Sequence, residues 1–305
     1  MKLAVIDLGT NTCNLLVAEV EGKSYRIVYQ GKVGVKLGKG GINKKQLTPE
    51  AFERAIAALS THQQTIEQLG GADRIFTIAT SAVRDADNRA DFEKALLDAT
   101  GLELSVISGD EEAKLIFGGV VLAFGQIPDN SLIMDIGGGS NEFIQTQDNK
   151  VVWKESFPLG VARAVERFPL SNPIFTDEIA AIEAWFDQGL QALWQQWEGR
   201  QASVLIGCSG AFDTLCDLID NTPPGTKARQ TQSVSLCEFK QISEEIIHST
   251  KAQREQLPAM EPLRVEMIVP AFILMRLVIR KLNISAITQT DFALREGVLR
   301  KWIND

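Results

Sequence analysis

The sequence is poor in the residue types that build metal–thiolate sites and disulfide frameworks. Its 305 residues include four cysteines and two histidines. The cysteines are Cys13, Cys208, Cys216 and Cys237. They are widely spaced, form no Cys-x-x-Cys pair and have apolar neighbours, so we predict buried free thiols. His62 and His248 lie on predicted helices, far from other ligand types, and we expect both at the surface.

Long apolar runs and an excess of basic charge are also missing. The most apolar stretch, 267–275, contains Pro270 and is shorter than the roughly 18 residues that a membrane span needs. The first predicted strand begins too early for a signal-peptide core to precede it. The net charge of −8 argues against broad attraction to nucleic acid or to membrane surfaces. We therefore expect a cytoplasmic protein that binds neither.

One motif occurs twice in the chain. Residues 7–12 read Asp-Leu-Gly-Thr-Asn-Thr, and residues 135–140 read Asp-Ile-Gly-Gly-Gly-Ser. Each copy lies between two apolar runs, which predicts a strand, a tight turn and a second strand. The chain is also longer than a usual single domain. The repeat therefore predicts two related halves with a cleft between them.

A glycine-rich turn after a strand suits an anion. Its backbone N–H groups approach the anion without obstruction by side chains, and an Asp at the strand end orients a hydrated cation. A single Asp-x-Gly turn is more often an ordinary hairpin. Two such turns facing each other would hold a phosphorylated chain and its metal ion from both sides.

The remaining pattern predicts an alternation of strands and helices. Strands are expected at 25–37, 75–79, 104–107, 131–136, 141–147, 150–157, 204–206 and 284–287, and helices at 48–69, 89–99, 110–124, 161–167 and 176–198. Two prolines and a glycine make 221–230 an exposed loop. The last helix, which ends at Trp302, is expected to pack back on the first domain.

The segment 32–45 carries five lysines and no acidic residue. They are Lys32, Lys36, Lys39, Lys44 and Lys45. A solvated loop is the ordinary interpretation of such a charge run. A local basic lining for a polyanionic substrate is the alternative, since the protein as a whole is acidic.

Two charged residues are placed where a phosphate-cleaving enzyme needs them. Glu112 begins a predicted helix and lies one turn from the apolar pair 115–116, so it projects inward and suits a base that activates water. Arg84 follows a strand and has the planar fork that clamps phosphate oxygens. The alternatives are a surface acid that complements the helix dipole and a surface ion pair with Asp85.

Asp135 and Glu142 flank the second glycine turn. Strand alternation aims Glu142 to the same side as Ser140, so the two acids offer hard oxygen ligands to Mg²⁺. The alternative for Glu142 is an exposed strand acid.

These residues resemble a known family, the exopolyphosphatase and guanosine pentaphosphate phosphatase (Ppx/GppA) family. The resemblance rests on six ordered motifs that span nearly the whole chain: 7–12, 79–85, 107–113, 135–142, 156–168 and 294–299. It implies an α/β protein of the actin-like ATPase superfold, with two ribonuclease-H-like domains flanking a central cleft. We draw the domains at 1–124 plus 289–305 and at 125–288.

The resemblance also implies magnesium-dependent hydrolysis of a terminal phosphoryl group from polyphosphate or from guanosine pentaphosphate. Glu112 would activate the water, and Asp7, Asp135 and Glu142 would serve the metal ion. The phosphates would be held by Arg84, Asn11, Thr12, Gly137, Gly138, Gly139 and Ser140, with Lys36 and Lys39 nearby. The resemblance leaves open whether the protein forms a homodimer.

Three departures from the family pattern predict a retuned site. Cys13-Asn14 stands where the family commonly has Phe-Arg, which removes a cation beside the first turn. Asn141 replaces a usual Thr, and 207–212 replaces a Gly-Gly-Thr-type turn. The chain also ends where longer members continue into a helical domain, so we expect a short form.

Two other function classes stay open. An ATP-dependent kinase or ATPase of the same superfold needs a roomy adenosine turn at 207–212, which Cys208 and Phe212 crowd. A catalytically weak nucleotide- or polyphosphate-binding regulator is favoured if Asn14 has removed an essential contact. Retention of Glu112 and of the other acids counts against the regulator.

Overall fold

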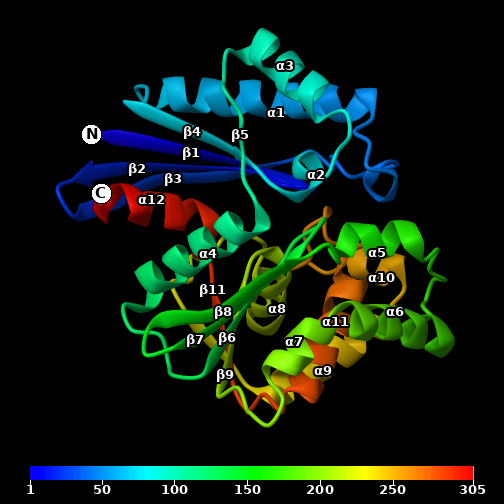
Figure 1. Ribbon diagram of the computed structural model, residues 1–305. Helices are drawn as coiled ribbons and strands as arrows, with labels where there is room; N and C mark the ends of the chain where they lie inside the picture. The colour runs from blue at the N-terminus through cyan, green and yellow to red at the C-terminus, as the bar shows by residue number, and fades with distance from the viewer. Residues whose placement is uncertain (305) are drawn as a thin grey trace. The chain divides into compact units, whose positions relative to one another are not determined.

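The structure, a computed structural model that describes residues 1–304, consists of two α/β units (Figure 1). Unit 1 comprises Met1–Leu122 and the chain from Leu294 onward, and unit 2 comprises Ala123–Ala293. The domain boundaries drawn from the sequence, which concern parts that fold independently, stay a prediction. No helix within residues 1–304 is long and apolar enough to cross a membrane.

Unit 1 contains a five-stranded sheet in the order β3-β2-β1-β4-β5. Its strands are β1 (Lys2–Leu8), β2 (Thr12–Glu21), β3 (Ser24–Gly34), β4 (Arg74–Ala79) and β5 (Ser105–Val106). The first three form an antiparallel meander, and β4 and β5 run parallel to β1. This is the strand order of a ribonuclease-H-like domain.

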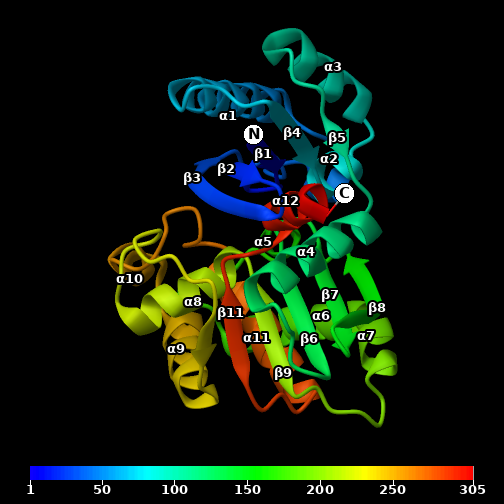
Figure 2. The same cartoon turned by 90° about the vertical axis from the view of Figure 1, so that its left-hand side faces the viewer.

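Helices cover both faces of this sheet, as Figures 1 and 2 show. They are α1 (Pro49–Gln68), α2 (Ser81–Arg84), α3 (Arg89–Thr100), α4 (Gly109–Phe124) and α12 (Leu294–Asn304), with a 3-10 turn at Ile42–Lys44. Thr48 caps the start of α1, and its side chain accepts a hydrogen bond from the N–H of Ala51 at 3.3 Å. Its buried face packs on the strand residues Ile6 and Leu8.

The helix α12 closes unit 1 on the opposite face of the sheet, where it contacts β1 and β2. Its approach to α4 is close: a Cβ built on Gly297 would lie 1.8 Å from the carbonyl oxygen of Leu115. Glu296 is fully buried and accepts a hydrogen bond from Gln30 at 3.2 Å. The return of the last helix to the first unit, expected from the sequence, is therefore present.

Unit 2 repeats this plan with one additional strand. Its strands are β6 (Ser131–Ile136), β7 (Asn141–Gln147), β8 (Lys150–Phe157), β9 (Val204–Cys208), β10 (Gln232–Val234) and β11 (Ile287–Thr290). The order β10-β11-β9-β6-β7-β8 again joins an antiparallel meander to parallel strands, here β9 and β11. The edge strand β10 was not predicted because three residues carry too little pattern.

The helices of unit 2 build its core around one apolar helix. They are α5 (Val161–Arg167), α6 (Thr176–Gly189), α7 (Gln191–Gln196), α8 (Gly210–Asp220), α9 (Leu236–His248), α10 (Lys251–Glu255) and α11 (Ile268–Lys281). α11 contacts α5, α6, α8 and α9, and it is buried over most of its length. This is the apolar stretch at 267–275 that the sequence shows.

Several elements differ from the sequence-based expectation. The helix expected over 176–198 is divided into α6, which ends at Gly189, and α7, which begins at Gln191. Glycine is a poor helix former, and Leu190 between the two helices is fully buried outside helical geometry. The third strand ends at Gly34, because the amides of 35–38 bond to the turn described below. Cys237 is exposed because it lies opposite the buried face of α9, which includes Phe239 and Ile246.

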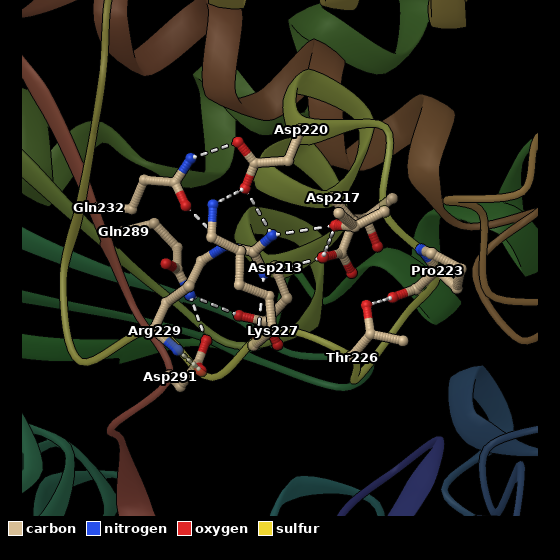
Figure 3. A network of polar contacts seen from close by, with 12 residues as sticks. Asp213, Asp217, Asp220, Pro223, Thr226, Lys227, Arg229, Gln232, Gln289 and Asp291 are labelled. Carbon is tan, nitrogen blue, oxygen red and sulfur yellow. Dashed lines mark hydrogen bonds and ion pairs between the residues drawn. The ribbon is translucent and has the colours of Figure 1, made fainter.

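The loop 221–230 is irregular and mostly exposed, as expected, but Arg229 within it is buried (Figure 3). Its guanidinium contacts Asp217 at 2.8 Å and Asp220 at 2.9 Å, both on α8. Its Nε also donates to Oε1 of Gln232 at 2.6 Å. A single arginine thus ties the loop to a helix and to an edge strand.

Candidate phosphate-binding site

The first repeated motif forms a tight turn between β1 and β2. The N–H of Gly9 donates to the carbonyl oxygen of Thr12 at 2.9 Å. The carbonyl oxygen of Thr10 accepts from the amide of Leu37 at 2.7 Å, and that of Asn11 accepts from the amide of Val35 at 2.9 Å. The turn is therefore held from one side, through its carbonyl groups, by the segment 35–38.

The second motif forms the same turn between β6 and β7. Here the N–H of Gly137 donates to the carbonyl oxygen of Ser140 at 3.0 Å. The start of α5 takes the other carbonyl oxygens. The Val161 N–H donates to the carbonyl oxygen of Gly137 at 3.0 Å, and the Ala162 N–H donates to that of Gly138 at 2.9 Å. The side-chain Nε of Arg163 donates to the carbonyl oxygen of Gly139 at 2.7 Å. Both turns are thus held by their carbonyl groups.

This arrangement decides where the amide groups point. In a trans peptide the C=O of one residue and the N–H of the next point in opposite directions. Carbonyls directed to 35–38 therefore turn the N–H groups of Asn11 and Thr12 the other way. In the second turn, carbonyls directed to α5 turn the N–H groups of Gly138, Gly139 and Ser140 away from that helix. Each turn consequently presents a row of amide donors, which is the geometry of a backbone anion nest.

Gly137 and Gly160 have a steric part in the second turn. The N–H of Gly137 is used inside the turn, so this residue does not offer its amide to a ligand. A Cβ on Gly137 would lie 2.5 Å from the oxygen of Ser140, and one on Gly160 would lie 2.2 Å from the oxygen of Gly138. Only glycine at 160 lets α5 approach the turn this closely.

The two hairpins differ in the residue that faces the aspartate. Asp7 pairs with Asn14 across the first hairpin, and Asn14 Nδ2 donates to Asp7 Oδ2 at 3.0 Å. Burial raises the pKa of the Asp7 carboxyl, and this hydrogen bond opposes the rise. Asp135 pairs in the same register with Glu142. The first hairpin thus has an amide where the second has a carboxylate.

The pair Asp135 and Glu142 fits a hard divalent cation. Both side chains are buried, and carboxylates directly opposite each other in a sheet are destabilising unless a positive charge lies between them. Ser156 Oγ donates to Glu142 Oε1 at 2.6 Å and orients it. Within residues 1–304 no group of three or more His, Cys, Asp and Glu side chains is arranged to hold a metal ion. A metal ion on this pair would need further oxygen ligands, such as water.

Arg84 and Glu112 lie together in unit 1. Arg84 Nη1 contacts Glu112 Oε2 at 2.7 Å and the carbonyl oxygen of Ile107 at 3.3 Å. The Glu112 carboxylate is buried, whereas Asp85 lies 3.7 Å from Arg84 Nε. Arg84 thus contacts both acids, and the pair with Asp85, which was the alternative interpretation, does not exclude the contact with Glu112.

The topology brings these groups to one edge of the unit 1 sheet. Leu8 at the end of β1 pairs with Ala79 at the end of β4, and Ala79 pairs with Val106 of β5. The turn at 9–12, Arg84 and Glu112 all follow these strand ends. The carboxyl edge of such a sheet is where ligands usually bind.

The lysine segment meets the first turn through its backbone. Lys36 has a left-handed conformation with φ 43°, and its N–H donates to the carbonyl oxygen of Asn11 at 3.1 Å. The side chain of Lys36 is half-buried, and that of Lys39 is exposed. Arg54 of α1 fixes this backbone by donating to Val35 and Lys36 carbonyl oxygens at 2.6 and 2.9 Å.

The turn at 207–212, after β9, is filled by side chains. The Phe212 ring lies so close to Gly207 that a Cβ there would be 2.1 Å from it. The Arg264 guanidinium similarly covers Gly210, where a Cβ would lie 1.8 Å away. Phe212 and Cys208 are fully buried. The crowding expected from the sequence is present.

Some residues of this site were not expected from the sequence. Arg163, Arg54 and Ser156 act on the backbone or on a carboxylate across more than ten residues of chain, and no local pattern marks such contacts. His62 is buried, not exposed as expected, and its Nε2 lies 3.0 Å from the carbonyl oxygen of Cys13. Burial lowers the pKa of this ring. An exposed His248 agrees with the expectation.

Comparison with known proteins identifies curated relatives. The chain is 30% identical over 286 residues to a bifunctional 3-dehydroquinate synthase/phosphatase of Fusobacterium nucleatum, covering 90% of this chain and 42% of that protein. It is 27% identical to exopolyphosphatase 1 of Mycobacterium tuberculosis, covering 99% of this chain and 88% of that protein. The chain therefore spans less than half of the first relative and most of the second.

Solved structures agree with the observed fold. An exopolyphosphatase from Cytophaga hutchinsonii has a TM-score of 0.93 and 33% identity, covering 100% of this chain and 98% of that one. An Aquifex aeolicus Ppx/GppA protein has a TM-score of 0.81, covering 100% of this chain and 98% of that one. At 21% identity this likeness is evidence of a shared fold and of nothing further. The expected superfold, that of the actin-like ATPases with two ribonuclease-H-like domains, is confirmed. The model of the Ppx/GppA phosphatase family matches residues 16–305, and the chain belongs to that family.

Proposed function

We propose that this protein is a phosphoanhydride hydrolase that releases the terminal phosphate of inorganic polyphosphate. The observation that carries the proposal is the pair of turns whose carbonyl groups are held from behind, so that their amides face outward. Such donors recognise phosphate oxygens without reading a base or a sugar. A substrate made only of phosphate groups suits them best.

Glu112 is proposed to take the proton from the attacking water. Its position at the start of α4 and its contact with Arg84 fix the carboxylate. An incoming phosphate competes for the Arg84 guanidinium. Once Arg84 turns toward the phosphate, the carboxylate loses part of its compensating charge and becomes a better proton acceptor. Arg84 would thus link substrate arrival to activation of the base.

Mg²⁺ is the proposed cofactor, and Asp135 and Glu142 would hold it. When bound, the ion would supply positive charge to the phosphate oxygens. The hydrogen bond from Ser156 orients the Glu142 carboxylate for this role. Asp7, the third predicted ligand, already accepts from Asn14, and its role at the metal ion stays a prediction.

Three observations favour polyphosphate over nucleotides. Among the relatives with most of their length covered, those of Mycobacterium tuberculosis and Cytophaga hutchinsonii bear the name exopolyphosphatase. Phe212 and Arg264 fill the turn at 207–212, where an adenosine would have to fit in a kinase or ATPase. Asn14 is committed to Asp7 and adds no cation for a second phosphorylated group. Guanosine pentaphosphate is the alternative substrate, and a silent polyphosphate-binding regulator is the alternative role.

The test is phosphate release from four substrates under one set of conditions. Tripolyphosphate, long-chain polyphosphate, guanosine pentaphosphate and ATP are compared with and without Mg²⁺. We expect magnesium-dependent release from the two inorganic substrates at rates well above that on ATP. Faster release from guanosine pentaphosphate would identify the alarmone as the substrate. Tight binding of polyphosphate without release would identify the regulator.

Removal of either carboxylate of the metal pair is expected to raise the magnesium requirement. Asp135→Asn and Glu142→Gln each delete one hard oxygen charge, so the Mg²⁺ concentration for half-maximal activity should rise about tenfold or more. Glu155→Gln is the matched control, since Glu155 is an exposed acid on the same sheet. A magnesium titration that is unchanged in both variants would remove the pair from the metal site.

The lysine segment is proposed to attract long polyanions. Replacing Lys36 and Lys39 by glutamine should weaken binding of long-chain polyphosphate and flatten its dependence on salt, because screened charge attraction is lost. The double variant Lys23→Gln and Lys150→Gln changes the net charge equally at two exposed sites elsewhere. Equal salt dependence in the two double variants would show that the segment is an ordinary solvated loop.

A further inference from the structure

The third carbonyl group of the second turn is held differently from the other two. Gly137 and Gly138 carbonyl oxygens accept from backbone amides of α5, but Gly139 accepts from the side chain of Arg163 at 2.7 Å. The N–H of Gly160 approaches the same oxygen at a longer 3.2 Å. Arg163 is 8% exposed, so its charge is buried directly behind the turn.

We propose that Arg163 is a positioning residue that fixes the peptide between Gly139 and Ser140 for phosphate binding. The inference rests on the proposed function and deepens it. Holding the Gly139 oxygen from behind keeps the Ser140 N–H directed toward the substrate side. The same buried cation adds positive potential to a turn built otherwise from neutral amides.

The peptide needs such a restraint because glycine permits its rotation. Gly139 has no Cβ to oppose a change of backbone angles. Rotation of this one peptide would replace the Ser140 N–H by the Gly139 carbonyl oxygen on the substrate side. An attractive group for phosphate would then become a repulsive one. Arg163, at 2.7 Å, is the nearer of the two donors that oppose this rotation, and the Gly160 amide, at 3.2 Å, is the other.

The first turn lacks this dependence on one side chain. Its Thr10 and Asn11 carbonyl oxygens accept only from backbone amides among the contacts described above. Arg54, the corresponding arginine, bonds to the carbonyl oxygens of Val35 and Lys36, one step behind the turn. We therefore expect loss of the Arg163 side chain to act locally on the second turn.

The experiment compares Arg163→Met, Arg163→Lys and Arg167→Met in the full chain. Arg167 lies one turn further along α5 and is exposed, so Arg167→Met is the matched control. Binding of a non-hydrolysable triphosphate with Mg²⁺ is measured by calorimetry, and kcat and KM are measured separately on tripolyphosphate. Arg163→Met should weaken binding about tenfold to a hundredfold, as expected for loss of one charge-assisted hydrogen bond. The loss should appear in KM more than in kcat.

Arg163→Lys should recover part of the affinity, because an ammonium group keeps the charge and one donor. It also carries the test if Arg163→Met does not fold. Wild-type affinity in a folded Arg163→Met, or an equal loss in Arg167→Met, would overturn the inference.

A crystal structure of Arg163→Met or Arg163→Lys gives a second readout that needs no activity. The peptide at 139–140 should be rotated or heterogeneous in Arg163→Met, and an unchanged peptide there would also overturn the inference. Failure of the wild-type protein to bind tripolyphosphate would instead contradict the proposed function.

Discussion

Replacing Glu112 by glutamine is expected to lower kcat on polyphosphate by roughly 10²–10⁴-fold, the usual contribution of a general base. The amide keeps the size of the side chain and still offers an oxygen to Arg84, which lies 2.7 Å away in the native protein. It cannot accept a proton from water. Binding of a non-hydrolysable triphosphate with Mg²⁺ should therefore stay within about threefold of wild type, a change of less than 1 kcal/mol.

The matched control is Glu111→Gln, on the preceding residue of the same helix. Glu111 is half-exposed and lies 3.5 Å from Lys301, so its loss should leave kcat nearly unchanged. Single-turnover phosphate release separates the chemical step from product release in both variants. Turnover by Glu112→Gln equal to that of Glu111→Gln would assign the base to another group.

Replacing Arg229 by methionine is expected to lower the free energy of unfolding by about 3–5 kcal/mol, the cost of breaking a buried ion pair from one side. Arg229 is 5% exposed and contacts both Asp217 and Asp220 (Figure 3). Methionine matches its length but leaves Asp217 buried without the guanidinium, whereas Asp220 keeps its ion pair with Lys227 at 2.6 Å. Denaturant unfolding measures the loss.

The pH dependence of this loss follows from Asp217. Burial already raises the pKa of its carboxyl, although Arg229 opposes the rise. A raised pKa in the folded state means that stability falls as pH increases through that pKa, and removal of Arg229 enlarges the effect. Arg229→Met should therefore lose more stability at pH 8 than at pH 5. The control Arg26→Met, which removes an exposed pair with Glu19, should cost much less at both pH values, because solvent screens that pair. Similar losses in the two variants would mean that the buried pair contributes little.

The parts of the site that sequence reasoning found are those whose chemistry is local. Asp7 and Asp135 each lie near the end of a strand, before a turn of small residues. A few neighbouring residues therefore predict both the turn and the aspartate beside it. The position of Asn11 and Thr12 in the first turn follows from the same letters. The strands beside each turn follow from local apolar runs, such as the fully buried β6, which is why most of both sheets was predictable.

The parts that it missed depend on contacts between distant residues. Arg163 lies 24 positions from Gly139, and nothing in its helix distinguishes it from the exposed Arg167. The burial of Arg229 likewise contradicts the polar, proline-containing loop around it. The break after Gly189 combines a poor helix former with packing, since the Leu159 side chain lies where a Cβ on Gly189 would be. In each case tertiary structure decides what propensity leaves open.

The discontinuity of unit 1 has a consequence for the order of folding during synthesis. One face of its sheet is covered by α12 only when that helix packs on it, with Gly297 against Leu115 and the Glu296 side chain fully buried. The ribosome makes α12 after all of unit 2 and adds ~5–20 residues per second. The nascent unit 1 therefore waits on the order of ten to thirty seconds for its last helix. Unit 2, which is one continuous segment, has all of its own strands and helices available before then, although it begins later in the chain.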